Sequence, residues 1–219
     1  QWRLAELHEL ATGRGVCVAI IVSGIASSHP DLAGQLIVSR NFVDGRKAAS
    51  ELHGTGVAGI IAARADNGIR IAGIAPQARI LGLRACWQDG RSPESPTLCD
   101  SFSLVKALYF AIEQKSDVIN LSLSGPEDRL IHQLLDIGLS RGITIVAAVD
   151  RGRPAGGFPA SVPGVIAVSN TSLAPALAQV YTAPGRDVPT TEPGGRWFLV
   201  NGSSYSAAHV SGLMALVRQ

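Results

Sequence analysis

The sequence has few charged residues and no long hydrophobic run. Only 16% of its 219 residues are Asp, Glu, Lys or Arg, whereas 46% are hydrophobic. Disordered chains have the opposite balance, so this composition indicates a folded globular domain. The formal net charge of +2 is spread along the chain, which argues against a nucleic-acid partner, because such proteins concentrate basic residues in patches. The longest apolar run, residues 16–22, is far shorter than the roughly 20 residues that cross a bilayer, so we expect no membrane span.

Cysteine is also scarce, and three residues are too few for a disulfide scaffold. Cys86 and Cys99 flank a polar, proline-containing loop, and two interpretations stay open: a disulfide that closes the loop, or two unrelated thiols. The disulfide would stabilise the fold by roughly 3 kcal/mol and would indicate an oxidising compartment. Cys17 lies in an apolar run, so we expect it in the core. No group of His, Cys and acidic residues has the spacing of a zinc site.

Short runs rich in Val and Ile predict buried strands. They lack the alternation of a half-exposed strand, and several intervals between them have helical spacing. This pattern favours an α/β fold in which a mostly parallel central sheet carries helices on both faces. The predicted strands are residues 16–22, 80–83, 118–123, 143–149 and 165–168.

Helices are predicted between and after these strands. The clearest follows Asp100, because apolar residues at intervals of three and four mark one face as far as Lys115, and Asp100 or Ser101 can cap its start. A dinucleotide-binding fold, the first alternative for this alternation, requires a glycine-rich turn after the first strand, and here only Gly24 follows closely. The other predicted helices are residues 53–65, 130–140 and 204–217.

Two segments rich in small residues suit nucleophilic catalysis. The segment GSSYSAAHVSG at 202–212 places Ser204 in the first turn of a predicted helix, where backbone amides and the helix dipole stabilise negative charge. The segment HGTGVAG at 53–59 places His53 at the start of another helix, where it can act as a general base. Each signal alone is weak, since a serine at a helix start is most often a cap and a lone histidine is usually structural.

Together the two segments resemble the subtilisin-like serine peptidases. Members of that family carry His-Gly-Thr continuing into Val-Ala-Gly, and Gly-Thr-Ser-Met-Ala followed by Pro-His-Val-Ala-Gly around the nucleophile. The resemblance extends over about residues 15–216 and implies the family's three-layer subtilisin-like fold in one peptidase domain, 1–219, expected to be trimmed at both ends because relatives commonly continue. Further agreeing stretches are HPDL at 29–32, IAP at 74–76, ILGLR at 80–84 and VINLSLSGP at 118–126.

The resemblance also implies residue roles. By it, Ser204 is the nucleophile and His53 its general base. It implies a polypeptide substrate or peptide ligand that pairs with a strand edge, and a propeptide as a further partner. The residues expected to form that edge are Ser122, Leu123, Ser124 and Gly125.

The resemblance fails at the family's catalytic acid. Members of the family have the sequence Val-Ala-Val-Ile-Asp in the first strand, and its Asp is the catalytic acid. This chain has VAIIV at 18–22, so the resemblance places Val22 in the acid position. Valine accepts no hydrogen bond, so His53 lacks the partner that selects its tautomer and stabilises the imidazolium. Loss of that carboxylate costs on the order of 10⁴-fold in turnover. The sequence places neither of the neighbouring acids, Asp31 and Asp44, next to His53.

A second departure concerns the oxyanion hole. Relatives have Ala-Ala-Gly-Asn, whose Asn amide donates to the developing oxyanion, whereas this chain has AAVD at 147–150. An ionised Asp150 repels the oxyanion, and loss of one donor costs about 10²- to 10³-fold. The acid-active sedolisins use aspartic acid there, and the corresponding low-pH hypothesis requires strong burial of Asp150, because aspartate ordinarily titrates below histidine.

Smaller departures surround these two. Ala148 and Val149 correspond to the substrate side-chain pocket, and Val149 in place of glycine is expected to narrow it and favour small side chains. Near the catalytic positions, Gly56 replaces the family's usual His and Tyr205 replaces Met.

Three interpretations of function follow. The first is a subtilisin-like serine endopeptidase whose activity is very low or absent, since the product of the two penalties is roughly 10⁶-fold or more, although such effects are not additive. The alternative is a non-catalytic pseudopeptidase that binds peptide or a regulatory partner. The third is that Val22 is a change made to inactivate the protein.

Other expectations concern the surroundings of the site. We expect that no cofactor is required. Calcium often stabilises members of the family, and the oxygen-rich DNG segment at 66–68 is a candidate for binding it. This segment is expected to be a simple turn, so no metal site is predicted. The family is mostly secreted or surface-bound, so a secreted, periplasmic or cell-surface location is expected. The protein is also expected to be a monomer. His29, His132 and the loop 151–153 are expected at the solvated surface.

Overall fold

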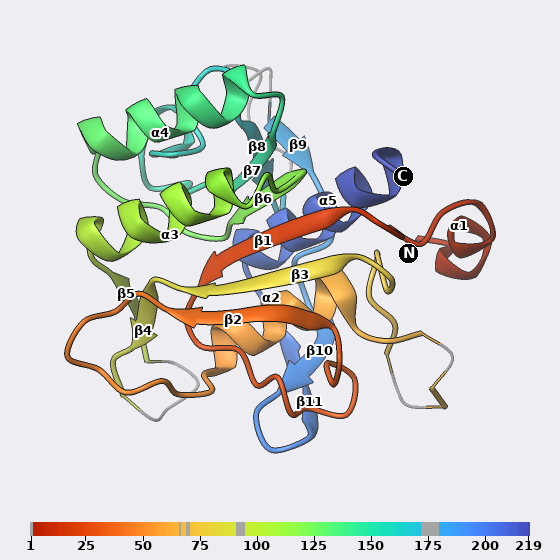
Figure 1. Ribbon diagram of the computed structural model, residues 1–219. Helices are drawn as coiled ribbons and strands as arrows, with labels where there is room; N and C mark the ends of the chain where they lie inside the picture. Colours follow the sequence, from red (N-terminus) through yellow and green to blue (C-terminus); the bar gives the residue numbers. More distant parts are fainter. Residues whose placement is uncertain (1, 66, 69–70, 91–94, 172–179) are drawn as a thin grey trace.

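The computed structural model describes residues 2–65, 67–68, 71–90, 95–171 and 180–219. Within these residues the chain forms a seven-stranded sheet with the order β2-β3-β1-β6-β7-β8-β9, and every neighbouring pair is parallel (Figure 1). The strands are β1 (Cys17–Val22), β2 (Leu36–Asn41), β3 (Arg79–Arg84), β6 (Val118–Leu121), β7 (Thr144–Ala148), β8 (Ile166–Ser169) and β9 (Val180–Thr182).

Helices cover both faces of this sheet. Helices α2 (Leu52–Ala62) and α5 (Ser203–Val217) lie on one face, and α3 (Ser101–Glu113) and α4 (Arg129–Ser140) lie on the other (Figure 1). Side chains of β1 alternate between the two halves of the core: Ile20 and Val22 pack with α2 and α5, whereas Ile21 packs with α3 and α4. Burial on both faces explains the unbroken apolar run of β1. The predicted three-layer α/β fold is confirmed.

Elements outside the core were not predicted. β2 lies at the sheet edge with mostly exposed side chains, so it carries no apolar run; backbone pairing with β3 holds it. A short helix, α1 (Leu4–Leu10), precedes β1, and the ring of Trp2 stands edge-on to His209 in α5. The remaining elements are β4 (Cys86–Gln88), β5 (Thr97–Cys99), η1 (Pro154–Gly156), β10 (Val188–Glu192) and β11 (Arg196–Val200). No helix in the described part of the chain is long and apolar enough to cross a membrane.

The expectation that His29 is a surface residue is wrong. Its side chain is 1% exposed, its ring stands edge-on to Trp197, and its Nε2 lies 2.9 Å from the carbonyl oxygen of Arg196. Both partners belong to β11, so a hairpin from a distant part of the chain covers this histidine. Its neighbours in sequence carry no sign of that contact.

Cys86 and Cys99 form a disulfide in the structure. The two residues lie opposite each other in the antiparallel β4–β5 ribbon, so this segment is a ribbon where it is described. Cys17 is buried and has a free thiol.

Reduction of this disulfide is expected to lower the free energy of unfolding by roughly 3 kcal/mol, because the opened chain regains loop entropy when it unfolds. Thermal unfolding with and without a dithiol reductant measures the loss. The double variant Cys86→Ser/Cys99→Ser should unfold at the midpoint temperature of the reduced protein, and the reductant should not change that temperature. In Cys17→Ser the reductant should still lower the midpoint temperature. Equal midpoints for oxidised and reduced protein would contradict the prediction.

Candidate active site

The sheet reverses its winding between β1 and β6. Ligands of doubly wound sheets bind beyond the carboxyl ends of the strands at such a point. A cavity of about 440 Å³ lies there, bordered by Val22 at the end of β1 and by Ser122 directly after β6. His53 and Ser204 line the same cavity. The fold therefore brings together the predicted base, the predicted nucleophile and Val22, the residue predicted to occupy the acid position.

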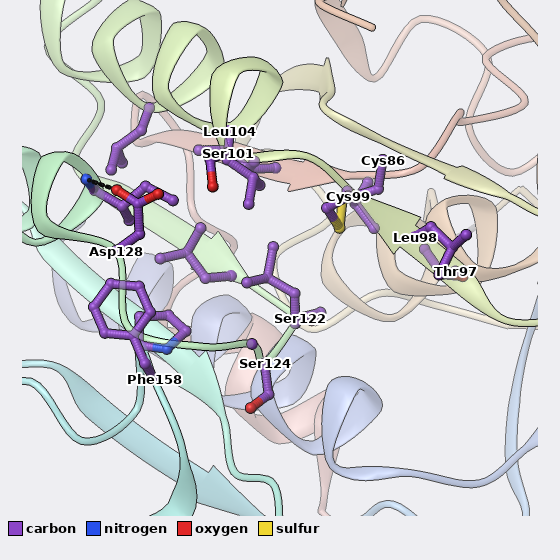
Figure 2. A pocket seen from close by; sticks show the side chains of 18 of the residues that line it. Cys86, Thr97, Leu98, Cys99, Ser101, Leu104, Ser122, Ser124, Asp128 and Phe158 are labelled. Atoms are coloured by element: carbon purple, nitrogen blue, oxygen red, sulfur yellow. Dashed lines mark hydrogen bonds between the residues drawn. A yellow bond between two sulfur atoms is a disulfide. The ribbon is translucent and has the colours of Figure 1, made fainter.

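The walls of this cavity are mostly apolar. Figure 2 shows the Cys86–Cys99 disulfide on one side and Phe158 on the opposite side. Leu104 and Leu108 of α3 also line it. Both leucines belong to the apolar face that the sequence predicts for this helix, and periodicity alone does not separate a core residue from a cavity residue.

A second cavity, of about 420 Å³, shares Leu123, Ser124 and Ser204 with the first. It is more polar, because charged and amide side chains border it. The residues that complete its lining are Ala148, Val149, Asp150, Arg151, Asn170 and Ser203. Every residue singled out for catalysis or substrate binding therefore lines one of the two cavities.

The segment 122–125 is not a strand, which corrects the prediction of a strand over 118–123. β6 ends at Leu121, and among the described residues of this segment only Gly125 forms a bridge, donating its N–H to the carbonyl oxygen of Phe158 at 2.9 Å. The chain leaves the ladder because its polar groups bind other elements: the carbonyl oxygen of Ser122 accepts the Ser204 hydroxyl at 3.1 Å.

His53 is held close to the end of β1 by its neighbour Gly54. A β-carbon at Gly54 would lie 2.3 Å from the carbonyl oxygen of Ser23, so only glycine permits this approach. The Gly54 N–H also donates to Ser23 Oγ at 3.0 Å. Since Val22 precedes Ser23 and is 2% exposed, this contact sets the start of α2 beside a buried valine.

No acidic side chain among the described residues binds the imidazole of His53. Its Nδ1 is buried and forms no hydrogen bond with any described residue, and burial lowers the pKa of His53 to about 4. The neighbouring acids are engaged elsewhere. Asp31 is fully buried and accepts the indole N–H of Trp197 at 2.7 Å, while Asp44 pairs with Lys106.

The desolvated imidazole of His53, a half-buried residue, predicts how stability depends on pH. The pKa of His53 is about 4 in the folded protein, against an ordinary value of 6.5. Between these values the unfolded state binds the proton and the folded state does not, so the free energy of unfolding falls as the pH is lowered, by up to about 3 kcal/mol. Above the unfolded value His53 is neutral in both states and contributes no slope.

Urea unfolding at a series of pH values through this window measures the slope. The variant His53→Gln should show a flatter dependence. Burial also lowers the pKa of His209, but that residue is present in both proteins, so its contribution cancels in the comparison. Equal slopes for the two proteins would contradict the assignment of this effect to His53.

Ser204 lies in the first turn of α5. The N-cap residue is Gly202, which offers no side-chain cap, so the positive end of the helix dipole is available beside Ser204. The Ser204 hydroxyl donates to the carbonyl oxygen of Ser122, and the Ser122 hydroxyl lies 2.8 Å from the carbonyl oxygen of Ser204. Asn120 extends this network into the core by donating to Ser211 Oγ at 2.9 Å. In this arrangement the Ser204 hydroxyl donates to Ser122, and no hydrogen bond joins it to His53 among the described residues.

Asp150 is tied to its own loop. Its carboxylate accepts the Gly152 N–H at 2.9 Å and pairs with Arg153 at 3.2 Å. With 40% of its side chain exposed, Asp150 lacks the burial that the low-pH hypothesis requires. Val149 is buried, and both its methyl groups lie near Gly156, so a facing glycine accommodates part of its bulk.

Gly56 and Tyr205, the two residues near His53 that depart from the family pattern, fit each other in the structure. A β-carbon at Gly56 would lie 3.3 Å from the ring of Tyr205, and that ring stands 5.8 Å from the His53 ring. Glycine at position 56 therefore leaves room for the tyrosine ring, whose burial raises the pKa of Tyr205 to about 12.

Metal ligands are not clustered in the described part of the chain: it has no group of three or more His, Cys, Asp or Glu side chains arranged to hold an ion. Asp66, the first residue of the DNG segment, lies outside the described residues.

Known proteins resemble this chain along most of its length. A model of the Subtilase family matches residues 13–219. The chain is 32% identical to an intracellular serine protease of Paenibacillus polymyxa, in an alignment covering 94% of this chain and 68% of that protein. It is 33% identical to the major intracellular serine protease of Bacillus subtilis, covering 94% and 69%, and 34% identical to a subtilisin of Bacillus pumilus, covering 99% and 82%.

A solved structure matches the fold as well. The prenylagaramide maturation protease PagA superposes with a TM-score of 0.80 over 98% of this chain and 79% of that one, at 24% identity. Two of the relatives above are named as intracellular proteases, so likeness to them gives no support to the expectation of secretion.

Proposed function

This chain belongs to the subtilase family, and we propose that it is a serine peptidase domain in which Ser204 is the nucleophile, His53 is the general base, and turnover is severely reduced. The observation that carries this proposal is the buried Nδ1 of His53, which has no hydrogen-bond partner in the described part of the chain, while Val22 borders the same cavity. Members of the family act on peptides, so the two cavities are proposed to hold a polypeptide.

In the proposed reaction, Ser204 Oγ attacks a peptide carbonyl while its proton passes to Nε2 of His53. To reach that point, the hydroxyl exchanges its bond to Ser122 for one to the imidazole. The same burial that keeps His53 neutral at pH 7 makes it a weak base, because desolvation opposes the imidazolium and no carboxylate offsets that cost. The acylation step is therefore proposed to be slow.

The oxyanion step meets a second obstacle. As the tetrahedral intermediate forms, negative charge develops near Ser204 at the start of α5, where the helix dipole stabilises it. Asp150 lines the second cavity, which Ser204 also borders, and it carries a carboxylate where relatives carry an amide donor. A carboxylate opposes that charge, so the proposed site is impaired in two steps of one reaction.

A fluorophosphonate probe, which reacts only with an activated serine, tests the proposal. We expect slow labelling of the wild-type protein, located at Ser204 by mass spectrometry, and no labelling of Ser204→Ala. Peptide hydrolysis at the rate of an ordinary subtilisin would contradict the proposed impairment. Absence of labelling after prolonged incubation would contradict the proposed role of Ser204 as a nucleophile.

A second candidate function is a non-catalytic peptide-binding module. It is favoured by the Ser204 hydroxyl, which bonds to Ser122 as a structural serine would. Peptides fitted with a fluorophore would then bind with unchanged affinity to wild-type protein and Ser204→Ala, and they would be recovered uncut. Cleavage that is lost in Ser204→Ala would exclude this alternative.

A further inference from the structure

A buried ion pair between Glu51 and Arg84 has no role in the chemistry above. The two side chains are 10% and 8% exposed. Arg84 Nη2 lies 3.0 Å from Glu51 Oε1, and Arg84 Nε lies 3.2 Å from Oε2, so the guanidinium and the carboxylate meet in a two-pronged contact. Arg84 is also the partner of Val22 across β1 and β3. The pair therefore lies beside the position of the missing acid.

Hydrogen-bond donors saturate the Glu51 carboxylate. Besides the guanidinium, Oε2 accepts the N–H of Gly24 and Oε1 accepts the N–H of Gln88 at 3.0 Å. Each oxygen thus has two donors, which occupies the four acceptor sites of a carboxylate. Glu51 consequently has no capacity left for His53 Nδ1, and it does not replace the missing acid as a hydrogen-bond partner.

The donors come from the elements that surround the start of α2. Gly24 follows β1, Arg84 ends β3, and Gln88 ends β4. Glu51 is the N-cap residue of α2, and His53 is the second residue of that helix. One side chain therefore connects the helix that carries the imidazole to β3, to β4 and to the segment that follows β1.

We propose that Glu51 is a positioning residue for His53: together with Arg84 it holds the start of α2, and with it the imidazole, in the cavity without an orienting acid. The inference rests on the proposed role of His53 as the general base. In a complete triad one carboxylate both orients the histidine and balances its charge. Here only the first of these two tasks is performed. Glu51 orients the helix, and because Arg84 neutralises it, the imidazolium gains no stabilising charge.

The test compares Glu51→Gln with wild-type protein in two measurements. Glutamine keeps the size of the side chain but loses the charge and turns an amide toward groups that are themselves donors. We expect the helix start to loosen and admit water. Followed by NMR, the His53 titration should then move upward by more than about one pH unit, from about 4 toward the ordinary value. In Val22→Asp protein, the same change should slow labelling of Ser204 at least about 10-fold.

A destabilising change away from the site is the matched control. Leu135 is fully buried in α4, on the opposite face of the sheet from α2, and Leu135→Ala lowers stability by leaving a cavity. It should leave the His53 titration unchanged and the labelling within about twofold. If Glu51→Gln moves the two measurements no more than Leu135→Ala does, the inference is overturned.

Two further outcomes are decisive. If Val22→Asp protein never labels, the proposed peptidase function fails, and the histidine titration alone decides the positioning role. If Glu51→Gln does not fold, Arg84→Lys takes its place, because lysine keeps the charge and loses the two-pronged contact. The His53 titration must then rise in the same direction, and an unchanged titration overturns the inference.

Discussion

Replacing Val22 with aspartate is expected to accelerate labelling of Ser204 by on the order of 10⁴-fold. The new carboxylate would border the cavity that His53 lines and accept a hydrogen bond from Nδ1–H, the buried group that has no partner among the described residues. A neighbouring negative charge stabilises the imidazolium, so the pKa of His53 rises from about 4 and the residue becomes a stronger base. The second-order rate constant of fluorophosphonate labelling, measured between about pH 4 and 9, reports the change.

The matched control is Val22→Asn, which has nearly the same shape as aspartate but no charge. An amide at this position does not stabilise the imidazolium, so labelling should remain close to the wild-type rate. Adding Ser204→Ala to Val22→Asp should abolish labelling. A folded Val22→Asp protein that labels no faster than Val22→Asn would contradict the assignment of position 22 as the defective acid site.

The gain in activity is expected to cost stability. Val22 is buried among apolar residues of β1, α2 and α5, and a carboxylate placed there loses its hydration. We therefore expect Val22→Asp to unfold at a lower midpoint than the wild-type protein while its circular dichroism spectrum stays unchanged.

Replacing Asp150 with asparagine in the Val22→Asp protein is expected to add a further increase of about 10²- to 10³-fold. The substitution removes a carboxylate from the cavity that Ser204 borders and supplies an amide donor for the oxyanion. It also breaks the ion pair with Arg153, but both side chains of that pair are substantially exposed, so stability should change little. Labelling rates and hydrolysis of a chromogenic peptide both measure the effect.

The variant Asp150→Ala separates loss of charge from gain of a donor. Alanine removes the repulsion without offering a hydrogen bond, so it should give a smaller increase than asparagine. Equal rates for the two variants would show that position 150 does not donate to the oxyanion. An acid optimum in the wild-type protein that disappears in Asp150→Asn would instead support the low-pH hypothesis, despite the exposure of this side chain.

Much of the fold is predictable from local patterns. A strand covered on both faces is apolar throughout, as in β1, and a helix that buries one face repeats its apolar residues every three to four positions, as in α3. Asp100, one of two predicted caps, accepts the N–H of Ser103 at the start of α3. Elements such as β2 escaped prediction because backbone pairing at an edge holds them and leaves no apolar signature.

The candidate site divides in the same way. The family motifs around His53 and Ser204, and the departures at Val22 and Asp150, are visible in the chain alone, because each motif is a short contiguous segment. The sequence also determined that these residues belong to one family pattern, since their order and distances agree with it.

Only the tertiary structure decided which groups bind one another. The Ser204 hydroxyl bonds to a residue 82 positions away, and Glu51 pairs with Arg84 from 33 positions away. Strand order and helix packing create such contacts, and no periodicity along the chain encodes them. For the same reason only the tertiary structure shows that Nδ1 of His53 has no partner among the described residues, because an unpaired atom is recognised by what surrounds it.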